Sequence, residues 1–133
     1  MTAGPTTAMV LAAGLGTRMR PLTDHIPKAL VPVAGRPLLD RVLDPLVAAG
    51  VQRAVVNVHH FADQVEQHLR SRTDLEVLIS DESEALLDSG GGIAKALALL
   101  GEAPIFVANI DSLWLEGAAP ALEGLKRAWN PEV

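Results

Sequence analysis

Short apolar runs alternate with one-sided, helix-like stretches along this chain. The apolar runs have the length and composition of strands that are buried on both faces. The other stretches place an apolar side chain at about every third or fourth position, as amphipathic helices do. The runs that predict strands are residues 8–12, 54–58, 75–79 and 105–108. The stretches that predict helices are residues 38–47, 61–69, 93–100 and 120–129.

This alternation predicts an α/β fold. Strands joined through helices are parallel with right-handed crossovers, and they pack as a three-layer α/β/α sandwich around a mostly parallel, Rossmann-like sheet. Pro45 lies inside the first predicted helix and is expected to kink or shorten it. Residues 13–36 are expected to form a long loop, and long loops in compact domains are usually functional.

Three polar segments follow the predicted strands. They are the glycine-rich turn after residue 12, the run of glycines at 90–92, and Asp111. Ligands of parallel sheets bind beyond the carboxyl ends of the strands. The three segments are therefore expected to meet at one crevice, although they lie far apart in the sequence.

The turn after the first strand carries the strongest chemical signal. It reads GLGTRMRP from Gly14, and a Pro-Lys pair that ends in Lys28 follows it. Glycines allow main-chain N–H groups to close around an anion, and Arg18 and Lys28 add positive charge, which suits a polyphosphate. A dinucleotide fingerprint would need glycine where Met19 stands, and a Walker loop would need its lysine directly after the glycines. The alternative is a tight turn with solvated basic residues.

From Ala8 to Trp114 the sequence resembles the sugar-1-phosphate nucleotidyltransferases, the enzymes that make nucleotide sugars. The resemblance implies the nucleotide-diphospho-sugar transferase fold. It also implies a reaction in which a sugar-1-phosphate and a nucleoside triphosphate give a nucleotide sugar and pyrophosphate. The catalytic domain of this family is longer than 133 residues, and its second metal-binding aspartate lies in the later half. Residues 1–133 are therefore expected to be the N-terminal, nucleotide-binding part of a single truncated domain, which could be inactive alone.

The resemblance also assigns roles to residues. Arg18 and the main chain of the glycine turn would bind the departing pyrophosphate, and Lys28 would lie between the nucleotide's α-phosphate and the sugar phosphate. The segment from Leu87 resembles a Leu-Gly-Thr-Ala-Gly segment that meets the base, with Asp88 in place of a common glycine. The residues expected to bind the nucleotide are Leu11, Ala12, Ala13, Gly14, Gly16, Thr17, Arg18, Lys28, Ser89, Gly90 and Gly91.

The same resemblance gives Asp111 a role as a ligand of Mg²⁺ and Asn109 a role in contacting a sugar hydroxyl. Magnesium prefers oxygen ligands and completes its shell with waters and substrate phosphates. Taken alone, Asp111 would fit a turn former or a helix cap better than a metal ligand. The glycines at 90–92, taken alone, would equally suit a flexible start of a helix.

Within the family, the sequence most resembles the bacterial N-acetylmuramate-1-phosphate uridylyltransferases of cell-wall recycling, so UTP is the expected nucleotide. The features that carry this resemblance are the NVHH segment from Asn57, the SGGG turn from Ser89, and Trp114. Mannose-1-phosphate guanylyltransferases and glucose-1-phosphate thymidylyl- or uridylyltransferases are the alternatives. An alternative of another class is a chain that binds the nucleotide without turnover.

Two polar clusters outside the motif could suggest metal sites. His59 and His60 are adjacent, and side chains of adjacent strand residues point in opposite directions. They are therefore expected to be a loop feature, and contact with the sugar is the alternative. Asp81, Glu82 and Glu84 are expected to form a solvated acidic loop.

Composition and charge narrow the choice of partner and compartment. The 16 acidic and 11 basic residues give a net charge of −5, which disfavours binding to nucleic acid. The chain has no cysteine, which excludes disulfides, and no apolar stretch approaches the roughly 20 residues of a membrane helix. The first residues do not resemble a signal peptide, so a cytoplasmic location is expected. An exposed sheet edge could pair with another copy, as in a homo-oligomer.

Overall fold

The computed structural model describes residues 5–84, 87–110, 125 and 128, and no side chain is described for Ser89. Several sequence predictions fall outside this range and are not tested by it. These are the metal ligand Asp111, the resemblance at Trp114 and almost all of the helix predicted over residues 120–129.

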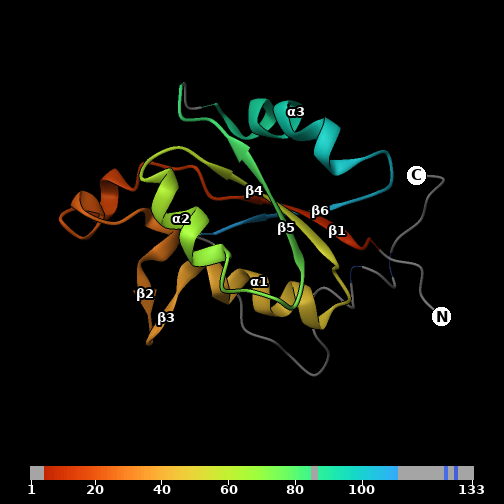
Figure 1. The fold of residues 1–133 in the computed structure, drawn as a ribbon, viewed down its shortest axis with the longest axis horizontal. Coiled ribbons are helices and arrows are strands. Elements are labelled where there is room, and N and C mark those ends of the chain that lie inside the picture. Colours follow the sequence, from red (N-terminus) through yellow and green to blue (C-terminus); the bar gives the residue numbers. More distant parts are fainter. Residues whose placement is uncertain (1–4, 85–86, 111–124, 126–127, 129–133) are drawn as a thin grey trace.

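A parallel sheet of four strands forms the centre of the described structure (Figure 1). The strands are β1 (Thr7–Leu11), β4 (Arg53–Val58), β5 (Glu76–Asp81) and β6 (Phe106–Asn109). Their order across the sheet is β5-β4-β1-β6, and each neighbouring pair is parallel. All four strands predicted from the apolar runs are confirmed within about two residues, and so is their parallel arrangement.

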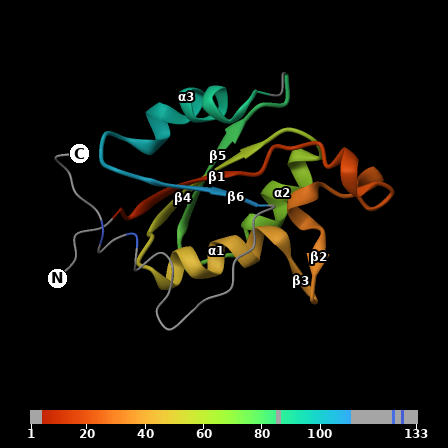
Figure 2. The same ribbon diagram turned by 180° about the vertical axis from the view of Figure 1, so that it is seen from behind.

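Helices cover both faces of this sheet. The helices α1 (Leu38–Ala48) and α2 (Ala62–Leu69) lie on one face, and α3 (Ser89–Leu100) lies on the other (Figures 1 and 2). Side chains alternate along each strand accordingly. Ala8 and Val10 of β1 pack in the core under α1 and α2, whereas Met9 between them packs with Val55 under α3. The predicted three-layer sandwich is therefore confirmed.

The segment predicted as one long loop contains short ordered elements. Three 3-10 turns, η1 (Thr17–Met19), η2 (Leu22–Asp24) and η3 (Lys28–Leu30), follow the end of β1. An antiparallel pair of two-residue strands, β2 (Pro32–Val33) and β3 (Arg36–Pro37), then leads into α1. These turns give the glycine-rich segment a defined shape.

Of the two effects predicted for Pro45, a kinked or a shortened helix, the shortening does not occur. The helix α1 continues past Pro45 to Ala48. Proline removes one helical hydrogen bond, but Leu43 and Leu46 on either side of it are fully buried in the core. The burial of these side chains keeps the helix on the sheet through the proline, because it outweighs the lost hydrogen bond.

A cluster of charged side chains ties the loop before β5 to α1. The side chain of Arg72 is 9% exposed and lies within 2.9 Å of Asp40, 3.0 Å of Asp44 and 2.7 Å of Asp74. Arg36 pairs with Asp44 through two hydrogen bonds of 2.7 and 2.9 Å. The hydrogen bond from Arg36, followed by that from Arg72, lowers the pKa of Asp44 below its usual value.

This cluster predicts how stability depends on pH. The folded-state pKa of Asp44 is lowered, so its contribution is present above the unfolded pKa of about 4 and is lost as pH falls through the folded value. The Asp44→Asn variant is expected to lose about 0.5 kcal/mol of unfolding free energy near about pH 6, because the pair is partly exposed and screened by solvent. Urea unfolding between about pH 2 and 6 measures the difference, which should disappear at the acid end.

The control for this prediction is Glu102→Gln. Glu102 is exposed and forms no ion pair with the described residues. Its replacement should leave the pH profile of the unfolding free energy unchanged. A constant offset between Asp44→Asn and the unaltered chain at all pH values would contradict the prediction.

Candidate functional site

The candidate site begins where β1 ends, at the glycine turn. Gly16 has a φ of +69°, and its carbonyl accepts a 2.6 Å hydrogen bond from the hydroxyl of the buried Thr23. A methyl group added at Gly16 would lie 2.6 Å from Thr23 Cγ2. The turn is therefore folded back tightly against η2, and a residue without a side chain is required at this position.

Lys28 packs against the same turn. A methyl group added at Gly16 would lie 3.1 Å from Lys28 Cβ, and one added at Gly14 would lie 3.9 Å from Lys28 Cδ. The stem of Lys28 therefore runs along the glycines, although it is 12 or more positions away in the sequence. The structure thus brings together the two halves of the motif from which a polyphosphate site was predicted.

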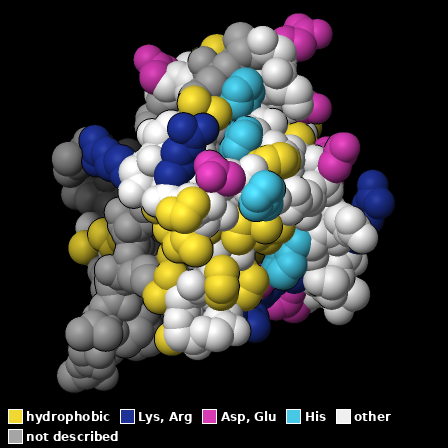
Figure 3. Space-filling view, turned by 90° about the vertical axis from the view of Figure 1, so that its left-hand side faces the viewer, with side chains coloured by type: hydrophobic (Ala, Val, Ile, Leu, Met, Phe, Trp, Pro, Cys, Tyr) yellow, Lys and Arg dark blue, Asp and Glu magenta, His cyan; other side chains and the backbone are white. Residues whose placement is uncertain are grey.

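The main-chain N–H groups of residues 14–18 are not engaged by other described residues: none donates a hydrogen bond within the part of the chain that the structure describes. Arg18 is exposed and forms no ion pair with the described residues. Consecutive N–H groups beside a guanidinium and an ammonium are the elements of a phosphate site. Figure 3 looks onto this side of the molecule, where charged and histidine side chains gather.

The other predicted segments reach the same end of the sheet. Asn109, the last residue of β6, is the register partner of Leu11 at the end of β1. A methyl group added at Gly92 in the first turn of α3 would lie 3.9 Å from Leu11 Cδ2. The end of β1 is thus flanked by the predicted sugar-contacting residue on one side and by the glycine run on the other.

The glycine run is part of a helix. Asp88 precedes α3, and its Oδ1 accepts a 2.6 Å hydrogen bond from the N–H of Gly91. This side chain caps the helix, so α3 begins at Ser89, four residues earlier than the sequence predicted. Gly90 and Gly91 therefore lie in the first helical turn, whose N–H groups point toward the carboxyl end of the sheet.

A buried polar pair that the sequence motifs do not predict lies beneath the site. Asn57 Oδ1 accepts hydrogen bonds from the main-chain N–H groups of Ala12 at 2.5 Å and Ala13 at 3.1 Å. Its Nδ2 donates to Glu82 Oε2 at 3.0 Å, and Glu82 Oε1 accepts from the N–H of Leu87 at 3.0 Å. The N–H groups of two residues predicted to bind the nucleotide are thus engaged by Asn57.

The prediction that Glu82 belongs to a solvated acidic loop is wrong. Glu82 is 0% exposed, whereas Asp81 and Glu84 beside it are exposed. The reason lies in the tertiary structure. The side-chain amide of Asn57 and the main-chain N–H of Leu87 each donate a hydrogen bond to the carboxylate of Glu82, so both of its oxygens are satisfied although the residue is buried. A buried Asn in an otherwise apolar strand was the signal in the sequence that could have pointed to such a partner.

The two adjacent histidines bond to different segments. His59 Nδ1 lies 2.5 Å from the carbonyl oxygen of Glu82, and His60 Nε2 lies 3.4 Å from the carbonyl oxygen of Thr23. In the part of the chain that the structure describes, no three His, Asp or Glu side chains form a cluster that could hold a metal ion. The expected magnesium ligand, Asp111, lies outside the described residues.

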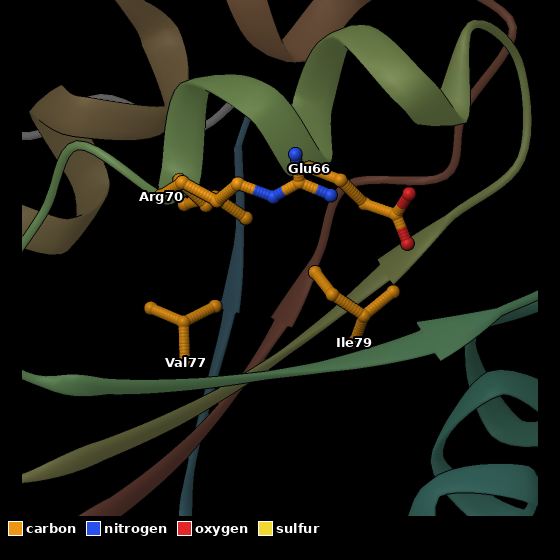
Figure 4. A pocket seen from close by; sticks show the side chains of 5 residues that line it. Glu66, Arg70, Val77 and Ile79 are labelled. Atoms are coloured by element: carbon orange, nitrogen blue, oxygen red, sulfur yellow. The ribbon is translucent and has the colours of Figure 1, made fainter.

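A shallow groove on another part of the surface is separate from these motifs. It lies between α2 and the edge strand β5 and is lined by Glu66, Leu69, Arg70, Val77 and Ile79 (Figure 4). None of these residues belongs to the predicted site.

Among the described residues, no helix combines the length and apolar character that crossing a membrane requires.

Comparison with known proteins assigns the family. Residues 8–130 match the model of the MobA-like NTP transferase domain. The chain belongs to this family. Two relatives are N-acetylmuramate alpha-1-phosphate uridylyltransferases: one from Caulobacter vibrioides, 60% identical over 99% of this chain, and one from Neisseria meningitidis, 45% identical over 80% of it. The chain covers 56% and 47% of these two proteins, so it spans about half the length of the relatives it matches.

Solved structures agree on the fold of this family member. A UDP-glucose pyrophosphorylase in complex with UDP-glucose matches with a TM-score of 0.81 at 19% identity, over 96% of this chain and 54% of that structure. An inositol-1-phosphate CTP transferase from T. maritima matches with a TM-score of 0.77 at 24% identity, over 98% and 51% of the two chains. The nucleotide-diphospho-sugar transferase fold expected from the sequence is confirmed.

Proposed function

We propose that this chain is the nucleotide-binding part of a uridylyltransferase that joins N-acetylmuramate-1-phosphate to UTP and releases pyrophosphate. The observation that carries the proposal is the stem of Lys28 lying along Gly14 and Gly16, next to the N–H groups of residues 14–18. The names of the Caulobacter and Neisseria relatives support the choice of substrates.

The proposed reaction is an in-line displacement at the α-phosphate of UTP. An oxygen of the sugar phosphate forms a bond to the α-phosphorus, and the bond from that phosphorus to the bridging oxygen breaks, so the electron pair leaves with pyrophosphate. The attacking oxygen is already ionised, so no strong base is needed. The difficulty is the repulsion between two anions, and catalysis comes from positioning and from neutralising charge.

Each cation of the turn has a distinct proposed task. Arg18 and the N–H groups of residues 14–18 bind the leaving pyrophosphate, because a guanidinium suits bidentate contact with phosphate. Lys28 lies between the α-phosphate and the sugar phosphate, where a compact ammonium can follow the charge as it moves. The first turn of α3 meets the edge of the base, and Asn109 contacts a sugar hydroxyl.

Asp111 is the proposed ligand of Mg²⁺. When bound, the metal would neutralise charge on the phosphates of UTP. The support from the described residues is indirect: Asn109, two positions earlier, pairs with Leu11 directly before the glycine turn. A cytoplasmic location and the pairing of two copies stay predictions from the sequence.

A panel of substrates tests this function. Pyrophosphate release is measured with UTP or GTP in the presence of magnesium, combined with N-acetylmuramate-1-phosphate, mannose-1-phosphate or glucose-1-phosphate. We expect UTP with N-acetylmuramate-1-phosphate to react at least about tenfold faster than any other pair, because selectivity depends on contacts to both the base and the sugar. A higher rate for GTP with mannose-1-phosphate would assign the guanylyltransferase function instead.

The same experiment separates an enzyme from a binding protein. Binding of UTP without pyrophosphate release from any pair would overturn the proposed activity and favour a chain that binds the nucleotide without turnover. Isothermal titration with UTP and magnesium supplies the binding measurement.

A further inference from the structure

The buried pair of Asn57 and Glu82 connects the glycine turn with the segment that leads into α3. Through Asn57 Oδ1 it bonds the N–H groups of Ala12 and Ala13, which open the glycine turn. Through Glu82 Oε1 it bonds the N–H of Leu87, just before α3. One hydrogen-bonded unit therefore spans the gap between the turn and the first turn of α3.

The pair also fixes how closely α3 approaches the sheet. A methyl group added at Gly92 would lie 3.1 Å from Asn57 Nδ2 and 3.1 Å from Glu82 Oε2. The carboxylate of Glu82 thus lies against the first turn of α3, where the partial positive charge of a helix start stabilises an anion. Both side chains are buried, at 4% and 0% exposure, and each has its hydrogen bonds satisfied.

Such a pair is costly to keep if its only role is packing. A buried carboxylate loses much solvation energy, and even buried ion pairs can often be replaced by apolar residues of the same volume without loss of stability. Its bonds lead to main-chain N–H groups on both sides of the end of β1, rather than to core side chains. A network of this kind can hold two segments in a single arrangement.

We propose that Asn57, oriented by Glu82, is a positioning residue that holds the glycine turn and the segment from Leu87 at a fixed separation to receive the base of the nucleotide. This inference rests on the proposed function. The pair acts through Ala12, Ala13 and Leu87, and it sets the affinity for UTP. In the proposed site the phosphate groups are bound further along the turn, at residues 14–18, whose main-chain N–H groups donate no hydrogen bond to Asn57 or Glu82 in the described structure.

An exchange of the two functional groups tests this role. In Asn57→Asp a second carboxylate faces Glu82 across the 3.0 Å hydrogen bond, and the like charges repel. In Glu82→Gln the amide has one acceptor for two donors, so one of the bonds from Asn57 and Leu87 is lost. In the double variant Asn57→Asp/Glu82→Gln, the amide donates to the carboxylate and still accepts from Leu87, so every hydrogen bond and the net charge are restored.

The measurements are the dissociation constants for UTP and for inorganic tripolyphosphate, both with magnesium. Each single variant is expected to bind UTP about tenfold more weakly, and the double variant to return within about threefold of the unaltered chain. Affinity for tripolyphosphate should change less than about threefold in all three. Gln52→Glu adds the same charge at the exposed residue before β4 and should change neither constant.

The outcomes separate this inference from the function on which it rests. Absence of UTP binding to the unaltered chain would overturn the proposed function and the inference with it. Binding of UTP that the single variants leave unchanged would overturn the positioning role alone. An equal loss of UTP and tripolyphosphate would also overturn it, because a merely structural role predicts that loss.

A measurement on the unaltered chain keeps the test independent of folding defects in the variants. Amide hydrogen exchange of this 14.0 kDa chain can be followed residue by residue by NMR. Addition of UTP and magnesium should slow exchange at Ala12, Ala13 and Leu87 together, by a common factor of at least about tenfold. Slowing at residues 14–18 without any change at these three amides would contradict the inference.

Discussion

Replacing Lys28 by alanine is expected to lower the turnover number about 100-fold and to change the KM for UTP less than about threefold. The loss in turnover corresponds to about 2.7 kcal/mol of stabilisation that is specific to the transition state. The stem of Lys28 lies along Gly14 and Gly16, so the packing of this stem restricts where the side chain can extend from the turn. In the proposed reaction, charge builds between the two phosphates beside this ammonium as the new bond forms. A positive group at that place stabilises the transition state more than the bound substrates.

Two control variants identify the cause of such a loss. Lys28→Arg keeps the charge on a larger, planar group and should retain about a tenth of the turnover. Lys95→Ala removes an exposed lysine of α3 that bonds to the carbonyl of Asp81, and it should leave turnover and KM unchanged. Pyrophosphate release over a range of UTP concentrations gives the turnover number and the KM of all three variants. Turnover of Lys28→Ala within about threefold of the unaltered chain would reject the proposed role of this residue.

The sheet could be predicted because its strands are apolar on both faces. Ala8 and Val10 pack in the hydrophobic core on one face of the sheet, and Met9 between them packs in the core on the other face. A strand covered by helices on both sides has no polar face, so the run itself was sufficient evidence. The resemblance predicted that Lys28 and the glycine turn act at one site. In the structure, the short turns between them fold the chain back and bring them together.

The pair beneath the site could not be predicted in the same way. Glu82 follows the end of β5 within an acidic stretch that reads as solvent-exposed. Its burial depends on Asn57, 25 positions earlier, and on the N–H of Leu87. The position of Asn57 in an apolar strand signals that its amide needs a partner, but local patterns do not say which residue supplies it. The free energy of burying a charge depends on the partner that the fold brings close.

The start of α3 was missed for a local reason. Three consecutive glycines disfavour a helix, so the helix was predicted to begin at Ile93. Asp88 caps it from the preceding position by bonding the N–H of Gly91. This cap offsets part of the low helix propensity of the three glycines. The absence of a side chain at Gly92 lets the helix lie close to Glu82 and Asn57. The spacing of Asp88 and Gly91 matches an N-cap and its third helical residue, and it was present in the sequence.

Replacing Gly16 by alanine is the second change with a large expected effect. The new methyl group would lie 2.6 Å from Thr23 Cγ2 and 3.1 Å from Lys28 Cβ, on a residue whose φ is +69°. We expect a loss of about 3 kcal/mol of unfolding free energy, part from the left-handed backbone and part from the contact. Because Lys28 must also move, UTP affinity should fall at least about tenfold.

Gly35 provides the matched control. Its φ is +82°, and a methyl group added there would meet nothing within 4 Å. The Gly35→Ala variant therefore measures the cost of the left-handed backbone alone, expected at about 1 kcal/mol. Urea unfolding gives the free energies of both variants, and UTP affinity should be unchanged in Gly35→Ala.

A second substitution separates the contact from the backbone strain at Gly16. Thr23→Ser removes the Cγ2 atom that the new methyl group would meet and retains the hydroxyl that donates to the carbonyl of Gly16. In a double-mutant cycle, Gly16→Ala with Thr23→Ser should recover about 1–2 kcal/mol of unfolding free energy, leaving a cost near that of Gly35→Ala. UTP affinity should recover in parallel, since the turn and Lys28 could then keep their places. Recovery of stability without recovery of affinity would mean that the methyl group at residue 16 still displaces Lys28 after the contact with Thr23 is removed. The position of this lysine along the glycines would then limit nucleotide binding.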